Sequence, residues 1–230
     1  MLTDRSVKAL FGQTYRFTEG KSMKLYELAP TPSARRVSIF LAEKGIDIPR
    51  VSVDIRGGEN LSPEFKAKSL NGRIPLLELD DGSYLCESVA ICRYLEEVHP
   101  SETSLFGNSP LERARVEMWQ RIIELQGLMV GFQAFRNLTG IYKDRENCVE
   151  AWGAESRQRV IDFLPTLDQQ LAKSSYVASD NFTIADISAF VFISFIKNLD
   201  ILVDDTLPHI QAWFATVAQR PAIVSLTPKN

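Results

Sequence analysis

The sequence predicts two domains of different class, an α/β domain followed by an all-α domain. Strand and helix patterns alternate over residues 23–99, whereas only helical periodicity follows over residues 110–221. The chain has 230 residues, of which 45% are hydrophobic, so it can bury the cores of both domains. Residues 100–109 are expected to form a linker and residues 222–230 a tail.

The composition argues against several classes of protein. A net charge of -3 supplies no basic field, which excludes nucleic acid or an anionic membrane as the main partner. The longest apolar run, residues 184–196, contains Asp186 and is too short to span a bilayer, so it predicts a buried helix. The three cysteines show no metal-binding spacing, and their odd number argues against a disulfide framework. We therefore expect a cytoplasmic protein without a metal site.

The N-terminal residues 1–22 stand apart from the predicted domains. They lack the apolar segment of a signal peptide, and a second methionine, Met23, directly precedes the first strand pattern. These residues are interpreted either as an extension of the protein or as a misassigned start.

The first domain is expected to have the order βαβ, a short helix, and then ββα. Apolar residues alternate with polar ones in the strand segments and recur at helical spacing in the others, and Gly45 ends the first helix. A right-handed βαβ crossover followed by a hairpin gives a mixed four-stranded sheet with helices on its faces. The strands are expected over residues 23–28 and 50–55, the hairpin over 76–85, and the helices over 33–44, 63–68 and 88–97.

The second domain is expected to contain a long amphipathic helix and a central buried one. The apolar stripe of the long helix, residues 111–132, should be buried against other helices, and Gly127 and Gly131 would permit a close approach or a bend. Thr183 and Asp186 have capping-box spacing before the helix that is apolar nearly all round. The stripe comprises Leu111, Ala114, Met118, Ile122, Leu125, Met129 and Phe132, and further helices are expected over residues 146–171 and 207–219.

Two short motifs near the end of the first domain predict a clamp for a small peptide. A cis turn at Pro75 would expose the backbone polar groups of Ile74, which an extended ligand could then pair with. The Glu87 carboxylate could meet an amino group, and Ser88 heads an apolar helix, whose N-terminus favours a carboxylate. The alternative is an edge-strand proline followed by an ordinary helix cap.

In combination, these motifs resemble those of the cytosolic glutathione transferases. The resemblance covers residues 23–221. Residues 73–75 resemble the cis-proline turn of that family, residues 87–88 its γ-glutamyl binding pair, and residues 183–186 its second-domain capping box. It extends to theta-like and zeta-like members and to the atypical yeast enzymes with their bacterial relatives.

The resemblance implies an N-terminal thioredoxin-like domain, a C-terminal helical bundle, and glutathione as the co-substrate of a detoxification enzyme without another cofactor. It implies that the backbone of Ile74 pairs with the cysteinyl unit, and that Glu87 and Ser88 hold the γ-glutamyl amine and carboxylate. Asn60 and Arg73 are implied for the glycine carboxylate. The alternatives are a loop-capping role for Asn60 and a solvated surface charge at Arg73.

The catalytic group is the weakest match to the family. Members place a hydroxyl or thiol near the start of the first helix to hydrogen-bond the glutathione sulfur, and alignment on that helix puts Thr31 in this position, with Ser33 beside it. Thr31 also reads as an N-cap, with Pro32 at the favoured first helical position. Cys86 is interpreted as a structural cysteine.

The resemblance also implies a small electrophile and a homodimer. Phe132, Phe135 and Arg136 are expected to line the electrophile pocket, with a core or dimer role as the alternative for the aromatic residues. Two other functions stay open at this point. One is a glutathione-dependent disulfide reductase, because residues 29–32 also resemble bacterial relatives with that activity. The other is a regulatory binding module of the stringent-starvation type, which the intact Glu87 and Ser88 pair disfavours.

Overall fold

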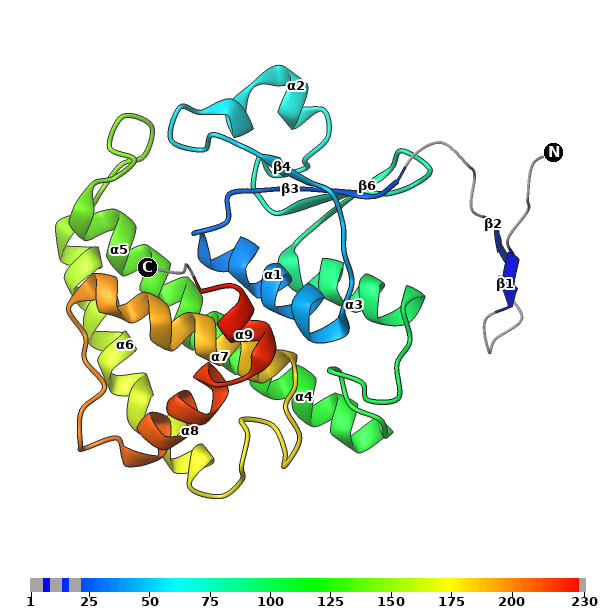
Figure 1. Cartoon of the computed structure of the whole chain (residues 1–230). Helices are drawn as coiled ribbons and strands as arrows, with labels where there is room; N and C mark the ends of the chain where they lie inside the picture. Colours follow the sequence, from blue (N-terminus) through cyan, green and yellow to red (C-terminus); the bar gives the residue numbers. More distant parts are fainter. Residues whose placement is uncertain (1–5, 9–13, 17–21, 228–230) are drawn as a thin grey trace. The chain divides into compact units, whose positions relative to one another are not determined.

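A computed structural model describes residues 6–8, 14–16 and 22–227 of the chain. These residues form two compact units (Figure 1). The first, which we call the sheet unit, comprises Met1–Ala34 and Asp47–Ile91. The second, the helical unit, comprises Arg35–Ile46 and Cys92–Asn230. The boundaries after Ala34 and Ile91 therefore fall inside two helices, Pro32–Lys44 and Ser88–Val98.

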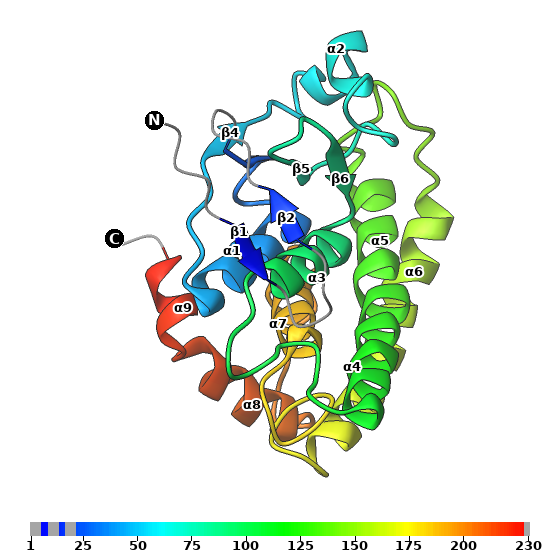
Figure 2. The same cartoon turned by 90° about the vertical axis from the view of Figure 1, so that its right-hand side faces the viewer.

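The sheet unit contains the predicted mixed four-stranded sheet, in the order β4-β3-β5-β6 (Figures 1 and 2). The first strand, β3 (Lys24–Glu27), runs parallel to β4 (Arg50–Ser52) and antiparallel to β5 (Leu76–Glu78). The last strand, β6 (Tyr84–Cys86), completes the expected hairpin with β5. The prediction of the sheet is thus confirmed, with strands shorter than the sequence pattern.

Most of the predicted extension, residues 1–22, lies outside the described residues. Its described parts are the short strands β1 (Ser6–Lys8) and β2 (Thr14–Arg16), which pair antiparallel with Val7 opposite Tyr15.

A hydrophobic cluster of the sheet unit packs against the predicted cis-proline turn. Val53, Phe65 and Leu76 are buried there, and the ring of Tyr26 meets that of Phe65 edge-on, with 6.4 Å between centroids. The partly buried residues that pack against this cluster include Ile74, the residue before Pro75 of the predicted turn. Packing therefore fixes the side chain of a residue whose backbone is expected to bind ligand.

The helices that follow the strands begin close to their predicted positions. Helix α1 (Pro32–Lys44) ends at Gly45, whose φ of 63° lies in the left-handed region that glycine adopts easily. The short helix α2 (Pro63–Lys66) follows the turn η1 (Glu59–Leu61), and α3 (Ser88–Val98) begins within the clamp motif.

In the helical unit, the predicted long helix consists of three continuous segments (Figure 2). These are α4 (Pro110–Ile122), the π-helical turn η2 (Ile123–Leu128) and α5 (Met129–Thr139). The remaining helices are α6 (Glu150–Leu171), α7 (Ile184–Phe195), η3 (Ile196–Leu199), α8 (Pro208–Ala218) and α9 (Pro221–Ser225). The predicted start of α6 was four residues too early, and α9 was not predicted.

The predicted orientation of the long helix is wrong. Leu111 and Leu125, both in the expected core stripe, are 61% and 56% exposed. The helix instead buries a face that combines the small residues Gly127, Gly131 and Ala134 with apolar ones such as Ile123 and Leu128. An added Cβ at Gly127 would lie 3.2 Å from the Phe192 ring of α7. Small residues let the two helices pack closely at Gly127. Four large residues of the predicted stripe are left exposed, namely Leu111, Met118, Leu125 and Met129. The buried face of the long helix includes Val116, Gln120, Ile123, Gly127, Val130, Gly131 and Ala134.

The predicted capping box at the start of α7 is confirmed. Both the backbone N–H and the hydroxyl of Thr183 donate to Asp186 Oδ2, at 2.9 and 3.0 Å. The other carboxylate oxygen accepts from the Val177 N–H and the Trp213 indole N–H, at 2.8 and 3.1 Å. A buried carboxylate is tolerated where its oxygens are so fully hydrogen-bonded. As predicted, α7 is the buried centre of the helical unit, with every residue from Ile184 to Ile193 buried.

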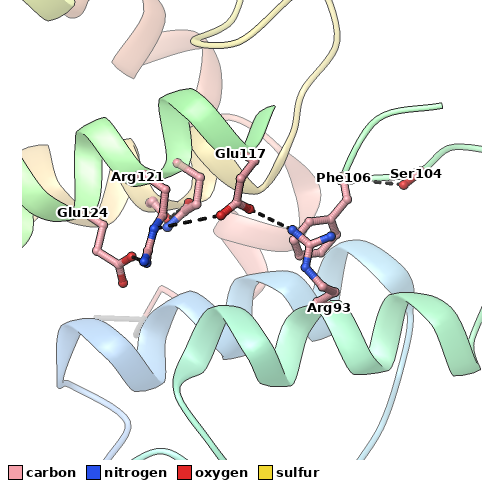
Figure 3. A network of polar contacts seen from close by, with 8 residues as sticks. Arg93, Ser104, Phe106, Glu117, Arg121 and Glu124 are labelled. Carbon is pink, nitrogen blue, oxygen red and sulfur yellow. Dashed lines mark hydrogen bonds and ion pairs between the residues drawn. The ribbon is translucent and has the colours of Figure 1, made fainter. Parts of the chain in front are cut away.

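A polar network joins α3 to α4 within the helical unit (Figure 3). The Arg93 guanidinium donates to Glu117 at 2.8 Å and lies over the Phe106 ring, 4.6 Å from its centroid. Arg121 extends this network along the long helix, because it forms ion pairs with both Glu117 and Glu124. Glu117 and Arg121 thus lie on the same helix, α4, as the exposed stripe residues Leu111 and Met118.

Candidate functional site

The peptide bond between Ile74 and Pro75 is cis, as the sequence predicts. Within the described residues, the backbone N–H and C=O of Ile74 form no hydrogen bond. The neighbouring strand β5 starts at Leu76, so these two groups stand at the end of a sheet ladder. An extended peptide could pair with them as a short additional strand.

Glu87 has a backbone conformation that is rare for a side chain of its kind. Its φ is 68°, in the left-handed region, where residues other than glycine are disfavoured by about 1 kcal/mol or more. Non-glycine residues held in such conformations cluster at binding and active sites. The turn directs the chain from β6 into α3, whose first residue is the buried Ser88.

The side chain of Glu87 is oriented by a residue that sequence reasoning missed. Asn71 donates from Nδ2 to Glu87 Oε1 at 2.9 Å. Its carbonyl oxygen in turn accepts from the Arg73 N–H at 3.0 Å and from the Ser69 hydroxyl at 3.3 Å. Asn71 therefore connects the cis-proline turn to the acidic residue of the clamp. No motif marks Asn71 in the sequence except its place four residues before Pro75.

Asn60 and Arg73 are both neighbours of Gly72, Asn60 through a hydrogen bond and Arg73 as the next residue in the chain. Asn60 Nδ2 donates to the Gly72 carbonyl at 2.6 Å, which holds together the loop before the turn. Arg73 is exposed, and its guanidinium forms no ion pair with any described acidic side chain. The loop-capping interaction of Asn60 is thus present, and it leaves one amide N–H for a ligand.

Thr31 directly precedes α1, in the N-cap position that the sequence predicts. Its hydroxyl donates to the Leu28 carbonyl at 2.8 Å, and its backbone N–H donates to the same oxygen at 2.9 Å. A threonine hydroxyl has one proton, so this group must turn away from Leu28 before it can donate to a sulfur. Ser33, the second residue of α1, is half-buried.

Phe132, Phe135 and Arg136 occupy α5 in the helical unit. The rings of Phe132 and Phe135 meet that of Phe195 edge-on, with centroid distances of 5.1 and 5.5 Å. Arg136 forms an ion pair with Glu146. The two phenylalanine rings thus share Phe195 as a partner, whereas the recorded contacts of Arg136 are with Glu146 and Tyr142.

Two pKa shifts bear on the reactivity of the chain itself. The hydrogen bond from the Tyr26 hydroxyl to Glu78, 2.7 Å long, raises the pKa of Tyr26 to about 12, so this phenol stays protonated near neutral pH. Burial raises the pKa of the Cys92 thiol, which makes it a poor nucleophile. Tyr26 and Cys92 are therefore poor candidates for the reactive group of the site.

Features of two other functional classes are missing from the part of the chain that the structure describes. They contain no group of three or more His, Cys, Asp and Glu side chains able to hold a metal ion. Among the described helices, none is both long and apolar enough to cross a membrane.

Sequence comparison assigns both parts of the chain to one family. Residues 31–98 match the description "Glutathione S-transferase, N-terminal domain", and residues 138–221 match "Glutathione S-transferase, C-terminal domain". Glutathione S-transferase 2 of Saccharomyces cerevisiae is 30% identical over 91% of this chain and 93% of its own length. The chain therefore belongs to the glutathione S-transferase family.

Solved structures agree with this assignment. A class Gtt2 glutathione S-transferase of Vibrio parahaemolyticus is 54% identical, with a TM-score of 0.80, over 88% of this chain and 96% of that one. Gtt2 from Saccharomyces cerevisiae is 29% identical, with a TM-score of 0.84, over 89% of this chain and 100% of that one. These likenesses confirm the resemblance to atypical yeast enzymes with bacterial relatives. They also confirm the thioredoxin-like and helical domains.

Proposed function

We propose that this glutathione transferase activates the thiol of glutathione for attack on a small electrophilic molecule. The observation that carries the proposal is the conformation of Glu87, which is held in the left-handed region beside the cis-proline turn and oriented by Asn71. Such a conformation costs stability, so a role in binding is a physical reason for the chain to retain it. Glutathione has the amine, carboxylate and peptide backbone that this turn can bind.

Each part of glutathione has a proposed partner in the sheet unit. The γ-glutamyl amine binds Glu87, and its carboxylate binds at Ser88 and the N-terminus of α3. The cysteinyl backbone pairs with the polar groups of Ile74, which have no hydrogen bond among the described residues. The glycine carboxylate binds Arg73, with the remaining amide N–H of Asn60 beside it.

The reaction requires the thiolate form of glutathione near neutral pH. A free thiol has a pKa near ~8.5, and lowering this value by about two units corresponds to roughly 3 kcal/mol. The Thr31 hydroxyl, the N–H groups at the start of α1 and the helix dipole together can supply this energy. The thiol proton leaves to solvent. The sulfur lone pair then forms the bond to the electrophilic carbon, and the leaving group departs with the electrons of its own bond.

The activation step is tested with Thr31→Ala and Ser33→Ala. We expect Thr31→Ala to slow turnover without abolishing it and to raise the pKa of the bound glutathione thiol, with a smaller effect for Ser33→Ala. The thiol pKa is measured from the ultraviolet absorbance of the thiolate. Thr216→Ala is a matched control, because the Thr216 hydroxyl also donates to a backbone carbonyl, at 3.0 Å, but lies on α8 of the helical unit. An unchanged thiol pKa in the double variant of Thr31 and Ser33 would show that the assignment is wrong.

The binding step and the competing activities are tested separately. Retention on immobilised glutathione should be lost in Glu87→Ala and Ser88→Ala. Assays with a chloronitrobenzene acceptor and with a small glutathione disulfide then distinguish conjugation from disulfide reduction. Failure of the wild-type protein to bind glutathione would contradict both enzymatic functions and favour a regulatory module.

We further propose a cytoplasmic homodimer that needs no cofactor besides glutathione as co-substrate. The three cysteines are free thiols, which suits a reducing compartment. The exposed stripe of α4 and α5 supplies an apolar surface in the helical unit, and Leu70, which is 98% exposed, supplies one in the sheet unit. Apolar surface of this kind is typical of protein interfaces. We expect the sheet unit of one subunit to pack against the helical unit of its partner.

A further inference from the structure

Phe132, Phe135 and Phe195 form a cluster of rings, which we call the phenylalanine cluster. Arg136 follows Phe135 directly on α5. Arg136 lies one helical turn beyond Phe132 on α5, so the two side chains share one face of the helix. An aromatic surface and a cation are thus adjacent within one unit. Together they can hold a ligand that has an apolar ring at one end and a negative charge at the other.

The guanidinium of Arg136 is fixed in place but only partly used. Its Nη1 donates to Glu146 Oε1, which is a single hydrogen bond from a group that has five N–H donors. Its carbon lies 4.9 Å from the centroid of the Tyr142 ring. The Arg136 side chain is nevertheless 42% exposed. Stacking and one ion pair therefore orient the group while N–H donors remain for a second acceptor.

The charges around Arg136 cancel one another. The segment from Tyr142 to Glu146 carries Lys143, Asp144, Arg145 and Glu146, which are two positive and two negative side chains. The net charge of the group is therefore the single positive charge of Arg136, which can attract an anion. A carboxylate can accept two parallel N–H bonds from a guanidinium, a geometry stronger than the single bond that Glu146 makes.

We propose that Arg136 selects electrophiles that carry an acidic group on an aromatic or other apolar body. The apolar body packs against the phenylalanine cluster, the acidic group binds the remaining N–H donors of Arg136, and Glu146 competes with it for the same cation. This proposal rests on the proposed function, since it names the substrate class of the transferase. It also makes Glu146 a residue that weakens binding of acidic substrates.

The proposal is tested by ligand binding, which does not depend on turnover. Nitrobenzoate and nitrobenzamide have nearly the same shape, and only the first is an anion. We expect the full chain to bind nitrobenzoate about tenfold more tightly, the difference that a charge-assisted hydrogen bond supplies. Titration calorimetry gives the selectivity ratio, which is the dissociation constant of nitrobenzamide divided by that of nitrobenzoate. This ratio should fall as ionic strength rises.

Two variants give opposite expectations for this ratio. Arg136→Gln should bring it close to one, whereas Glu146→Gln should raise it several-fold, because the competing carboxylate is gone. Arg159→Gln is the matched control, since the Arg159 guanidinium also stacks on an aromatic ring, that of Trp152, at 5.8 Å. It should leave the ratio unchanged.

The outcomes separate this proposal from the proposed function. A wild-type ratio near one, or a ratio that Arg136→Gln and Glu146→Gln do not move in opposite directions, overturns the role of Arg136. Turnover of chlorodinitrobenzene and retention on immobilised glutathione test the transferase function independently. For an active enzyme, the turnover of chloronitrobenzoate relative to chlorodinitrobenzene should follow the same order across the variants.

Discussion

Glu87 shows how a single residue of this protein can carry information about function. A glycine would adopt its φ of 68° without steric cost, yet the chain has a glutamate there and orients the side chain through Asn71. The sequence predicted a binding role for Glu87 from its place before an apolar helix. It could not predict the backbone conformation or the Asn71 contact, because both depend on how the two loops meet.

Substitution of Glu87 should separate stability from binding. Glu87→Gly and Glu87→Ala both remove the carboxylate, so both should lose retention on immobilised glutathione. Only glycine relieves the strain, so we expect the glycine variant to exceed the alanine variant by about 1 kcal/mol in free energy of unfolding. Denaturant unfolding monitored by circular dichroism measures the difference. Equal stabilities would show that the turn imposes no cost on the native residue.

At the scale of elements, the long helix of the helical unit was predicted correctly as a helix but in the wrong orientation. The sequence of the long helix allows either of two helix faces to be buried. One face has large apolar residues, and the other includes Gly127, Gly131 and Ala134. Periodicity favoured the first because it counts hydrophobic side chains. Close packing against α7 selected the second, since only small residues leave room for the Phe192 ring.

Two glycines of this helix make a matched test of close packing. A Cβ at Gly127 would lie 3.2 Å from the Phe192 ring, whereas a Cβ at Gly131 would lie 3.5 Å from the nearest atom of Phe195, an ordinary contact. We expect Gly127→Ala to cost about 1–3 kcal/mol in free energy of unfolding through overpacking. Gly131→Ala should be neutral or stabilise by up to about 1 kcal/mol, because alanine favours the helix. Thermal and denaturant unfolding would contradict this if Gly131→Ala proved the more damaging.

For the whole molecule, the exposed stripe has a consequence for assembly. It runs along α4, η2 and α5 and includes Met118 and Leu125. The ion pairs of Arg121 with Glu117 and Glu124 lie on the same long helix (Figure 3). Exposed pairs of this kind contribute little to stability by themselves. The stripe, in contrast, is a large apolar surface that a partner subunit could bury.

Charges placed in the stripe should therefore break the dimer. We expect the wild-type protein to be dimeric at micromolar concentration. Met118→Glu combined with Leu125→Glu should raise the dissociation constant at least about 100-fold, because buried unpaired charges cost several kcal/mol. Leu202→Glu, which changes a 76% exposed leucine outside the stripe, should leave the dimer intact. Light scattering after size exclusion measures the assembly, and a monomeric wild type would contradict the proposed interface.

The sequence alone determined the features that depend on neighbouring residue types. It predicted the mixed sheet, the cis bond before Pro75, the helix that begins at Ser88, and the box of Thr183 and Asp186, because turns, strands and caps form from local chemistry. Only the tertiary structure decided which face of the long helix is buried, which residue orients Glu87, and that Phe195 packs against Phe132 and Phe135. The physical reason is that these features arise from contacts between segments far apart in the chain, where packing and hydrogen-bond geometry select among patterns that the sequence permits equally.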